Sequence, residues 1–374
     1  MDHRRQARRP AAISLTWKHV RARRLARGAL TERSPSLVDV ARGTGGIHAQ
    51  VQASAELQLA SRVEGITQQD VRDALWRDRT LVKAWTLRGT LHLHPADELP
   101  LWFAARGAVS GEIRDLAAWP DPTGVVHPPV SAAEGAKLQA AVWDAFAGDE
   151  ALLRDELATR VVKRAGRKHE GRLRSGFGFF TGELCQGPPQ RNKTTLVRPD
   201  QWLGKWKPVE PEDALREILR RFLHAYGPAR PADFREWFGA DVPFDLVDVE
   251  EVDVEGHRAF VLAGDTEFPE LGKSVRLLPE YDVYVMGFRE REHLVPERVR
   301  AQVAAHGRGR YEGPAGVRFL LVDGVAAGLW ERKKSARRLE VTVTPVGRVN
   351  RASLAAEAER LAAFLGVEPV LTVA

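Results

Sequence analysis

The chain repeats one pattern, in which short helical segments are followed by strand-like alternation and proline-rich links separate the blocks. One link, "WPDPTGVVHPPV", covers residues 119–130, and a second lies at residues 208–211. Clusters of proline and glycine interrupt helices and strands. The pattern therefore favours tandem modules, each with its own helices and strands, over one large α/β core.

The first block has the layout of a winged helix. Thr16 is placed to cap a helix that ends at Gly28, and Thr67 is placed to cap a later one. Residues 81–95, "LVKAWTLRGTLHLHP", then predict two strands about a turn at the Arg-Gly pair. Helices followed by a β-hairpin are typical of winged helices, whose helix-turn-helix relatives place one helix in or near a DNA groove.

From about residue 275 the pattern becomes rich in strands. The segment "VRLLPEYDVYVMGF" is expected to be one of them, the pair Asp323-Gly324 predicts a hairpin, and a last helix is expected at residues 351–364. We expect an α+β protein, with tandem winged-helix modules followed by a C-terminal β-barrel-like domain. The predicted division is a basic disordered tail at 1–12, winged-helix modules at 13–118, 131–207 and 211–265, and the β-barrel-like domain at 270–374.

Composition limits the class of protein and its partners. The 374 residues carry a formal net charge of +6, with a pI of about 9.6, and most of the basic residues are arginine. A basic surface rich in arginine suits a polyanion, although an excess of arginine over lysine is also typical of GC-rich genomes. The single Cys185 excludes an internal disulfide, fits a reducing cytoplasm and is expected to be buried in an apolar helix. No apolar run reaches the roughly 18 residues that span a bilayer.

A polar pair stands out at the start of a predicted helix. The stretch Gly45-Gly46-Ile47-His48-Ala49-Gln50 precedes helical spacing that continues to about Arg62. Glycines let the backbone turn freely, and the helix N-terminus offers free N–H groups and the positive end of its dipole. On pattern alone, the simpler interpretation is a solvated histidine and a glutamine that caps the helix.

Four stretches of the sequence, in this order, resemble one protein family. They are "GGIHAQVQASAELQLASRV", "LVKAWTLRGTLHLHPADEL", "LLPEYDVYVMGFRERE" and "FLLVDGVAAGLWERK". Over about residues 15–365 the chain resembles the AlkZ/YcaQ-like winged-helix DNA glycosylases, several of which act on adducts of genotoxic natural products. In that family a Gln-x-Gln or Gln-x-Asp tripeptide carries the catalytic residues. His48-Ala49-Gln50 resembles the form found in a His-x-Gln subgroup.

The resemblance implies that His48 and Gln50 hold the water that hydrolyses an N-glycosidic bond. Base release passes through a sugar cation, and a purine alkylated at N7 or N3 is already positively charged, so it needs no acid to leave. Gln50 can orient the water through its amide, and a neutral His48 can accept the water's proton. The tripeptide lacks the carboxylate of the Gln-x-Asp relatives. No lysine lies beside it in the sequence, so no Schiff-base lyase step is expected.

Other polar residues are expected to contact DNA. His92 and His94 lie two apart in a predicted strand and share a face. No Cys pair or HExxH helix accompanies them, so phosphate-facing residues of the wing are favoured over a zinc site. Basic turns could contact the DNA backbone, although such runs are otherwise solvated surface. The expected DNA-binding residues, besides the two histidines, are Arg88, Arg191, Lys193, Arg289, Arg332, Lys333 and Lys334.

Tyr281 and Asp282 match an aromatic–Asp pair of the resembling family. The Asp is expected to hold a turn, and it could also support the site by a hydrogen bond or by stabilising the sugar cation.

The sequence thus predicts a monofunctional DNA glycosylase that removes alkylated, bulky N7 or N3 purine adducts. Its role would be base excision repair or self-resistance to a DNA-alkylating natural product. We expect no cofactor and no metal, a double-stranded DNA substrate, a monomer, no membrane association, and a cytoplasmic, nucleoid-associated location. Two alternatives remain open, a non-catalytic DNA-binding regulator and a resistance protein that sequesters the toxin.

Overall fold

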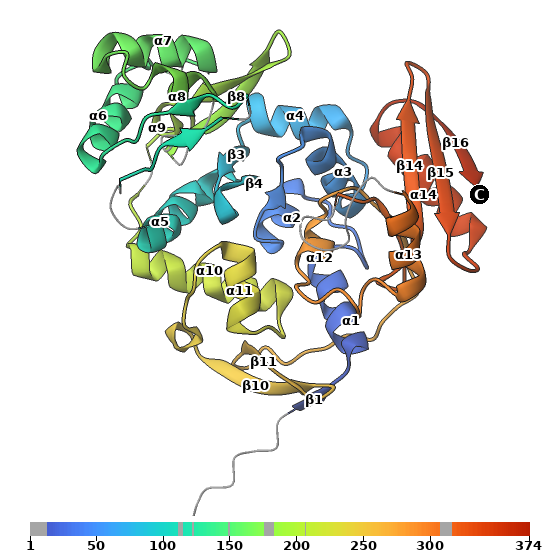
Figure 1. Ribbon diagram of the computed structural model, residues 1–374. Coiled ribbons are helices and arrows are strands. Elements are labelled where there is room, and N and C mark those ends of the chain that lie inside the picture. Colours follow the sequence, from blue (N-terminus) through green and yellow to red (C-terminus); the bar gives the residue numbers. More distant parts are fainter. Residues whose placement is uncertain are drawn as a thin grey trace, which may run out of the picture.

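The computed structural model describes residues 13–110, 115–121, 123–148, 150–175, 183–205, 207–306 and 316–374. The blue N-terminal part lies at the centre of the molecule, with the green and yellow parts on one side and the orange-to-red C-terminal part on the other (Figure 1). The α+β architecture of successive helix-and-hairpin units before a curled C-terminal sheet is confirmed. The tail predicted at residues 1–12 lies outside the described residues.

The first module consists of capped helices around a hairpin. Its elements are α1 (Trp17–Arg27), α2 (Leu37–Gly43), β2 (Ile47–His48), α3 (Gln52–Arg62), α4 (Gln68–Trp76), β3 (Leu81–Trp85), β4 (Leu91–Pro95) and α5 (Leu99–Ser110). Thr16 caps α1, and Thr67 forms a capping box with Asp70 at the start of α4. The predicted hairpin is confirmed, with β3 and β4 antiparallel and Arg88 in the turn at a φ of 54°.

The second module shares a sheet with the first. Its elements are β5 (Trp119–Pro120), β6 (Val126–His127), α6 (Ala132–Trp143), β7 (Leu152–Leu153), α7 (Arg154–Ala165), α8 (Glu170–Ser175), β8 (Cys185–Gln190), β9 (Lys193–Val197) and α9 (Pro199–Trp202). The six strands run in the order β2-β4-β3-β8-β9-β7. Cys185 pairs with Ala84 across β8 and β3, so the helix expected there is wrong, because a short apolar run fits a buried strand equally well. Burial raises the pKa of the Cys185 thiol, which makes it a poor nucleophile.

The third module receives a strand from the start of the chain. Its elements are α10 (Pro211–Tyr226), α11 (Pro231–Phe238), β10 (Val249–Val254) and β11 (His257–Leu262). The short strand β1 (Ile13–Leu15) pairs in parallel with β10. Phe222, Phe234 and Trp237 form an aromatic core, and α5 of the first module packs into the same cluster. Modules that follow one another in sequence are therefore not independent in space.

The C-terminal domain is an open five-stranded sheet that curls into a half-barrel. Its elements are β12 (Val275–Leu278), α12 (Val283–Met286), α13 (Glu297–His306), β13 (Phe319–Val322), β14 (Val325–Lys334), β15 (Arg338–Pro345), α14 (Arg351–Phe364) and β16 (Glu368–Val373), with the strands in sequential order. The hairpin at Asp323-Gly324 is confirmed. The long strand expected through "VRLLPEYDVYVMGF" is wrong beyond Leu278, because Asp282 caps a short helix there. No helix in the described ranges is long and apolar enough to cross a membrane.

The half-barrel packs directly on the first module. Apolar side chains of α2, α3 and α4 form one core with β12, β14, β15 and α14. Within it, the Trp330 indole nitrogen donates to the Leu278 carbonyl at 2.8 Å. A second core joins α1 and the β10–β11 hairpin to α12 and α13. Helix α3 is therefore fixed between the shared sheet and the half-barrel, and the residues just before it are held in place.

Candidate active site

The Gly45-Gly46 pair lets β2 approach two bulky side chains. Gly45 and Gly46 have φ values of 68° and 107°, in the left-handed region that glycine tolerates. A Cβ at Gly46 would lie 2.3 Å from the His94 ring, and one at Gly45 would lie 2.8 Å from the Trp237 ring. The two glycines are needed for this close approach, which sets the position of His48 two residues later.

His48 belongs to a row of three histidines on one face of the shared sheet. It pairs with His92 in the antiparallel β2–β4 ladder, and the two ring centroids lie 5.2 Å apart in a T-shaped arrangement. His94 lies 6.0 Å from His92, and its Nε2 is 2.8 Å from the Thr86 hydroxyl. Among the described residues, no three His, Cys, Asp or Glu side chains are grouped so that they could hold a metal ion.

The three rings are held neutral by their surroundings. Burial lowers the pKa of His48 to about 4, and the charges of Arg88 and Lys83 contribute to the same shift. Burial also lowers the pKa of His94 to about 3 and that of His92 well below its usual value. A neutral imidazole keeps one lone pair and one N–H, so each ring retains an acceptor nitrogen at physiological pH.

Gln50 lies beside His48 and is exposed to solvent. The helix it precedes begins after Val51, which makes no side-chain cap bond, so Gln50 does not cap α3. Its Oε1 instead accepts a long hydrogen bond from the Leu91 backbone N–H at 3.4 Å. Ala49 is fully buried in the core on the opposite face. Gln50 lies in the bend that follows β2, and its side chain turns back toward β4.

A buried network supports this segment from within α3. The Gln58 amide nitrogen donates to the His48 carbonyl at 2.9 Å, and its oxygen accepts from the Val283 backbone N–H at 3.2 Å. Arg62 forms a fully buried, two-pronged ion pair with Asp282 at 2.6 and 2.8 Å. Asp282 is 0% exposed, and its carboxylate also accepts from the Tyr284 backbone N–H at 2.9 Å, which holds the turn before α12.

Tyr281 brings the half-barrel to the histidine row. Its ring centroid lies 5.6 Å from that of His48. The residue has a φ of 61°, an unfavourable conformation for an aromatic side chain. Its two neighbours fix it there, because Glu280 pairs with Arg318 at 2.6 Å and Asp282 is held as described above.

The opposite face of the same strands carries charges that the sequence spacing did not reveal. The Lys83 ammonium donates to Gln52 Oε1 at 3.0 Å, and the Gln52 amide reaches Glu56 at 3.4 Å. Glu56 also accepts from Gln68 at 2.6 Å and from Arg72 at 3.1 Å. Lys83 is 6% exposed, and burial lowers its pKa to about 8. The only hint of this network in the sequence is a lysine inside an apolar strand.

Comparison with known proteins decides the family. The sequence model of the AlkZ-like DNA glycosylases matches residues 41–364. The chain belongs to the AlkZ-like DNA glycosylase family. It is 33% identical over 365 residues to an interstrand DNA cross-link repair glycosylase of Streptomyces sahachiroi, with 89% of this chain and 91% of the relative covered. It matches the structure of Streptomyces sahachiroi DNA glycosylase AlkZ with a TM-score of 0.78 and 28% identity, over 97% of this chain and 100% of that one.

Family membership selects among the interpretations left open by the sequence. The chain is a hydrolase of the DNA N-glycosidic bond, which sets aside a non-catalytic regulator and a sequestering protein. Both His48 and Gln50 lie within the matched range. The assignment of the His-x-Gln subgroup and the roles of the two side chains remain predictions.

The histidines and arginines expected to bind DNA divide into buried and exposed groups. His92 and His94 are 1% and 0% exposed, so neither is a surface residue of the wing and the expectation that they face phosphate is wrong. Arg88 donates to the Glu236 and Trp237 carbonyls at 3.1 and 2.6 Å, which ties the turn of the hairpin to α11. The residues that stand at exposed hairpin ends are Arg191, Lys193, Lys333 and Lys334, with Arg332 half-buried beside them.

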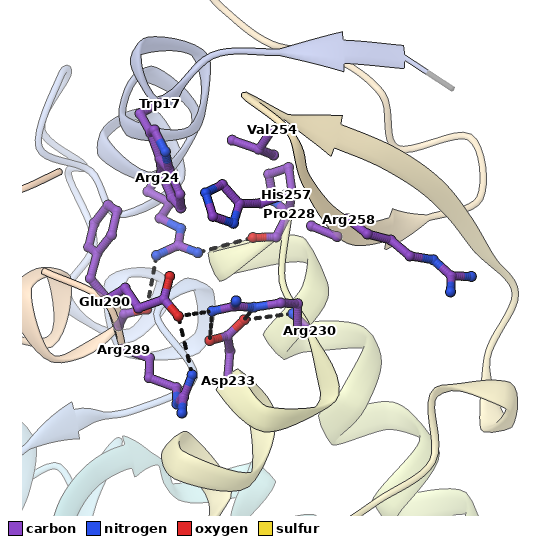
Figure 2. A pocket seen from close by; sticks show the side chains of 13 residues that line it. Trp17, Arg24, Pro228, Arg230, Asp233, Val254, His257, Arg258, Arg289 and Glu290 are labelled. Atoms are coloured by element: carbon purple, nitrogen blue, oxygen red, sulfur yellow. Dashed lines mark hydrogen bonds and ion pairs between the residues drawn. The ribbon is translucent and has the colours of Figure 1, made fainter. Parts of the chain in front are cut away.

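Arg289 lines a separate pocket where α1, α11 and the β10–β11 hairpin meet (Figure 2). It pairs with Glu236 and Glu290, each at 3.4 Å. Arg24 donates to two backbone carbonyls in the same pocket, and Arg230 lies between Asp233 and Glu290. The cavity encloses about 30 Å³, room for a water or two and far too little for a purine. We interpret it as a joint between modules in which the arginines are already engaged.

Proposed function

We propose that this glycosylase removes cationic, alkylated purines from double-stranded DNA, with His48 and Gln50 placing the attacking water. The observation that carries the proposal is the pair itself, a neutral imidazole beside an exposed amide at the junction of β2 and α3. The Nδ1 of His48 is buried without a hydrogen-bond partner, so Nε2 is the nitrogen left to meet a water. Gln50 can orient that water but cannot deprotonate it.

The substrate class follows from the state of the acids near the site. Among the described residues, Glu56, Glu280 and Asp282 lie on elements that carry or contact the site, and each is engaged by an arginine. None is available to protonate a neutral base as it leaves. A purine alkylated at N7 or N3 already carries the positive charge, so release requires only a stabilised sugar cation and a placed water. Purines alkylated at N7 or N3 are therefore the favoured substrates, and we propose that bulky adducts are among them.

The surface supports a duplex rather than a free base as the substrate. The β8–β9 and β14–β15 hairpins both extend toward the top of Figure 1, on either side of α4. Arg191 and Lys193 stand at the end of the first, and Lys333 and Lys334 at the end of the second. These side chains could contact phosphates of one duplex. The relative named as an interstrand cross-link repair glycosylase suggests that cross-linked adducts belong in the substrate panel.

The test is single-turnover base release from duplexes that carry 7-methylguanine, a bulkier N7 adduct, an N7 cross-link or uracil. We expect release of the cationic bases and none of uracil, with a rate that is constant from pH 9 to pH 5 and falls only near pH 4, where His48 becomes protonated. Efficient release of uracil, or a rate that rises steadily toward low pH, would contradict the proposal. Activity should survive EDTA, and abasic product should remain uncleaved until alkali is added, as for a monofunctional enzyme.

Two further expectations concern context. We expect the enzyme to act as a cytoplasmic, nucleoid-associated monomer, and duplex affinity should fall with salt with a log–log slope of roughly −0.9 per phosphate contacted. A role in self-resistance would require a neighbouring biosynthetic gene cluster for a DNA-alkylating compound.

A further inference from the structure

His92 is the buried histidine closest to the proposed water, and its hydrogen bonding sets its tautomer. Its Nδ1 lies 3.1 Å from the Thr90 carbonyl oxygen. A carbonyl can only accept, so Nδ1 carries the proton and Nε2 carries the lone pair. The ring faces the His48 ring across the β2–β4 ladder at 5.2 Å. At this distance the two rings are in direct edge-to-face contact. Both side chains point to the same side of the sheet, so a water that bridges their Nε2 atoms would lie beside the pair of rings, and neither Nε2 is among the buried polar atoms without a partner.

We propose that His92 is a second catalytic imidazole, whose Nε2 lone pair accepts one proton of the attacking water while His48 Nε2 accepts the other. The inference rests on the proposed function of His48 and Gln50. Two acceptors for its two protons orient the water so that its lone pairs are directed away from the histidines. The Gln50 amide can donate to one lone pair, which leaves the other for the sugar. An enclosed water with three polar partners is well held.

The chemical step balances without any further reactant. The water oxygen bonds to C1′ as the C1′–N bond breaks, and the electron pair of that bond neutralises the departing cationic base. One water proton transfers to His48 Nε2 and later leaves to solvent, while the other remains on the new C1′ hydroxyl, hydrogen-bonded to His92 Nε2. His92 thus orients the water without itself becoming protonated.

The surroundings of His92 are consistent with a ring that never takes the proton. His94 and His48 lie beside it on the same face, and the Arg88 guanidinium lies close enough to act on it electrostatically. His94 differs from His92 in two respects, because its Nε2 is engaged with the Thr86 hydroxyl and its ring packs on Trp102 at 4.2 Å. Its other nitrogen, Nδ1, is buried against Gly46, so we assign His94 a packing role and His92 the acceptor role.

Three substitutions distinguish the roles of the two ring nitrogens of His92. His92→Asn keeps a donor near the position of Nδ1 and removes the group at Nε2. His92→Gln keeps a polar atom near Nε2, and His92→Phe keeps only the ring shape. In single-turnover release of 7-methylguanine we expect roughly 10- to 100-fold losses for the Asn and Phe variants, a smaller loss for Gln, and unchanged duplex affinity. Phe and Asn variants within about twofold of wild type would overturn the proposal.

A matched control removes a buried imidazole elsewhere. His169 in the second module is 5% exposed, and His169→Phe should leave base release unchanged. If wild type releases no alkylated base, the proposed function fails; if His48→Ala is inactive while His92→Phe is active, only this inference fails. Should the His92 variants not fold, ¹⁵N NMR of histidine-labelled wild type decides the tautomer. A protonated Nδ1 and an unprotonated Nε2 at His92 between pH 5 and 8 support the proposal, and the opposite tautomer overturns it.

Discussion

The two faces of the β2–β4–β3 strands are both buried, and the polar groups on them are used in opposite ways. One face, called the neutral face below, carries the neutral rings of His48, His92 and His94, and the Nδ1 atoms of His48 and His94 are buried there without a partner. The other face, called the charged face below, otherwise packs on the apolar core and carries Lys83, which is linked through Gln52 to Glu56 of α3 and on to Arg72. Each of these charged groups has a partner, as a buried charge requires. The neutral face leaves ring nitrogens without a partner, which marks it as the face where chemistry can occur.

The faces also act on each other. The charge of Lys83 contributes to the low pKa of His48 through the sheet, after burial and Arg88. A low pKa keeps His48 unprotonated at physiological pH, so it can accept from water, although it makes the ring a weak base. A weakly basic imidazole suits a reaction in which the departing purine is already cationic and the water attacks only after the C1′–N bond has largely broken. The charged face therefore supports both the fold and the protonation state of the site.

The largest loss of activity is expected when a side chain that contacts the proposed water is removed. His48→Ala and Gln50→Ala should each reduce single-turnover base release by roughly 10²-fold or more, because each removes a partner of the attacking water. Duplex affinity measured by fluorescence anisotropy should change little, since neither residue is expected to contact phosphate. Wild-type release rates in both variants would show that the neutral face is not the active site.

The charged face should respond in the opposite way. Glu56→Ala leaves buried Lys83 without its acidic neighbour and Gln68 without its acceptor, and it should lower the free energy of unfolding by about 3 kcal/mol. Base release per folded molecule should stay within a few-fold of wild type. Urea denaturation and kinetics normalised to the concentration of folded enzyme, measured on one preparation, would separate the loss of stability from any loss of activity. A variant as stable as wild type but inactive would reverse the roles of the two faces.

A smaller effect concerns pH. The pKa of His48 is about 4 when folded and 6.5 when unfolded, so the unfolded chain binds protons more readily as the pH falls. Stability from this residue is complete above pH 6.5 and is lost as the pH falls toward 4, by about 2 kcal/mol at pH 5. Urea midpoints at pH 7 and pH 5 should differ less for His48→Phe than for wild type. Equal differences would mean that His48 is not buried in its neutral form.

How far the sequence could predict these faces depends on the range of the interactions. The caps at Thr16 and Thr67, the hairpin that carries His92 and the turn at Asp323 are set by neighbouring residues, and each was predicted correctly. The joining of β3 to β8 was not predictable, because it depends on contacts about a hundred residues apart. Module boundaries remain predictions for the same reason.

The site was predictable only in part. The Gly45-Gly46 pair and the tripeptide marked the neutral face, whereas the burial of His94 depends on packing by Trp102 of α5. Glu56 lies on α3, six residues after Gln50, and in the structure it acts on Lys83 behind the opposite face. Sequence spacing indicates which residues share an element, but not which face of a sheet the next helix covers.

The smallest effect tests whether the two faces are coupled at all. Lys83→Met removes the cation behind the sheet without touching any group proposed to contact the water, so the pKa of His48 should rise toward its usual value. Arg88→Met should raise it further, because Arg88 contributes more than Lys83 to the present shift. Histidine NMR titration of the two variants and wild type would measure both changes. A higher pKa of His48 also has a kinetic consequence. In each variant, the pH at which base release falls should increase by as much as the pKa of His48 does in that variant. If Lys83→Met leaves the His48 titration unchanged while Arg88→Met shifts it, the charged face only stabilises the fold, and the protonation state of the active site is set from the Arg88 side alone.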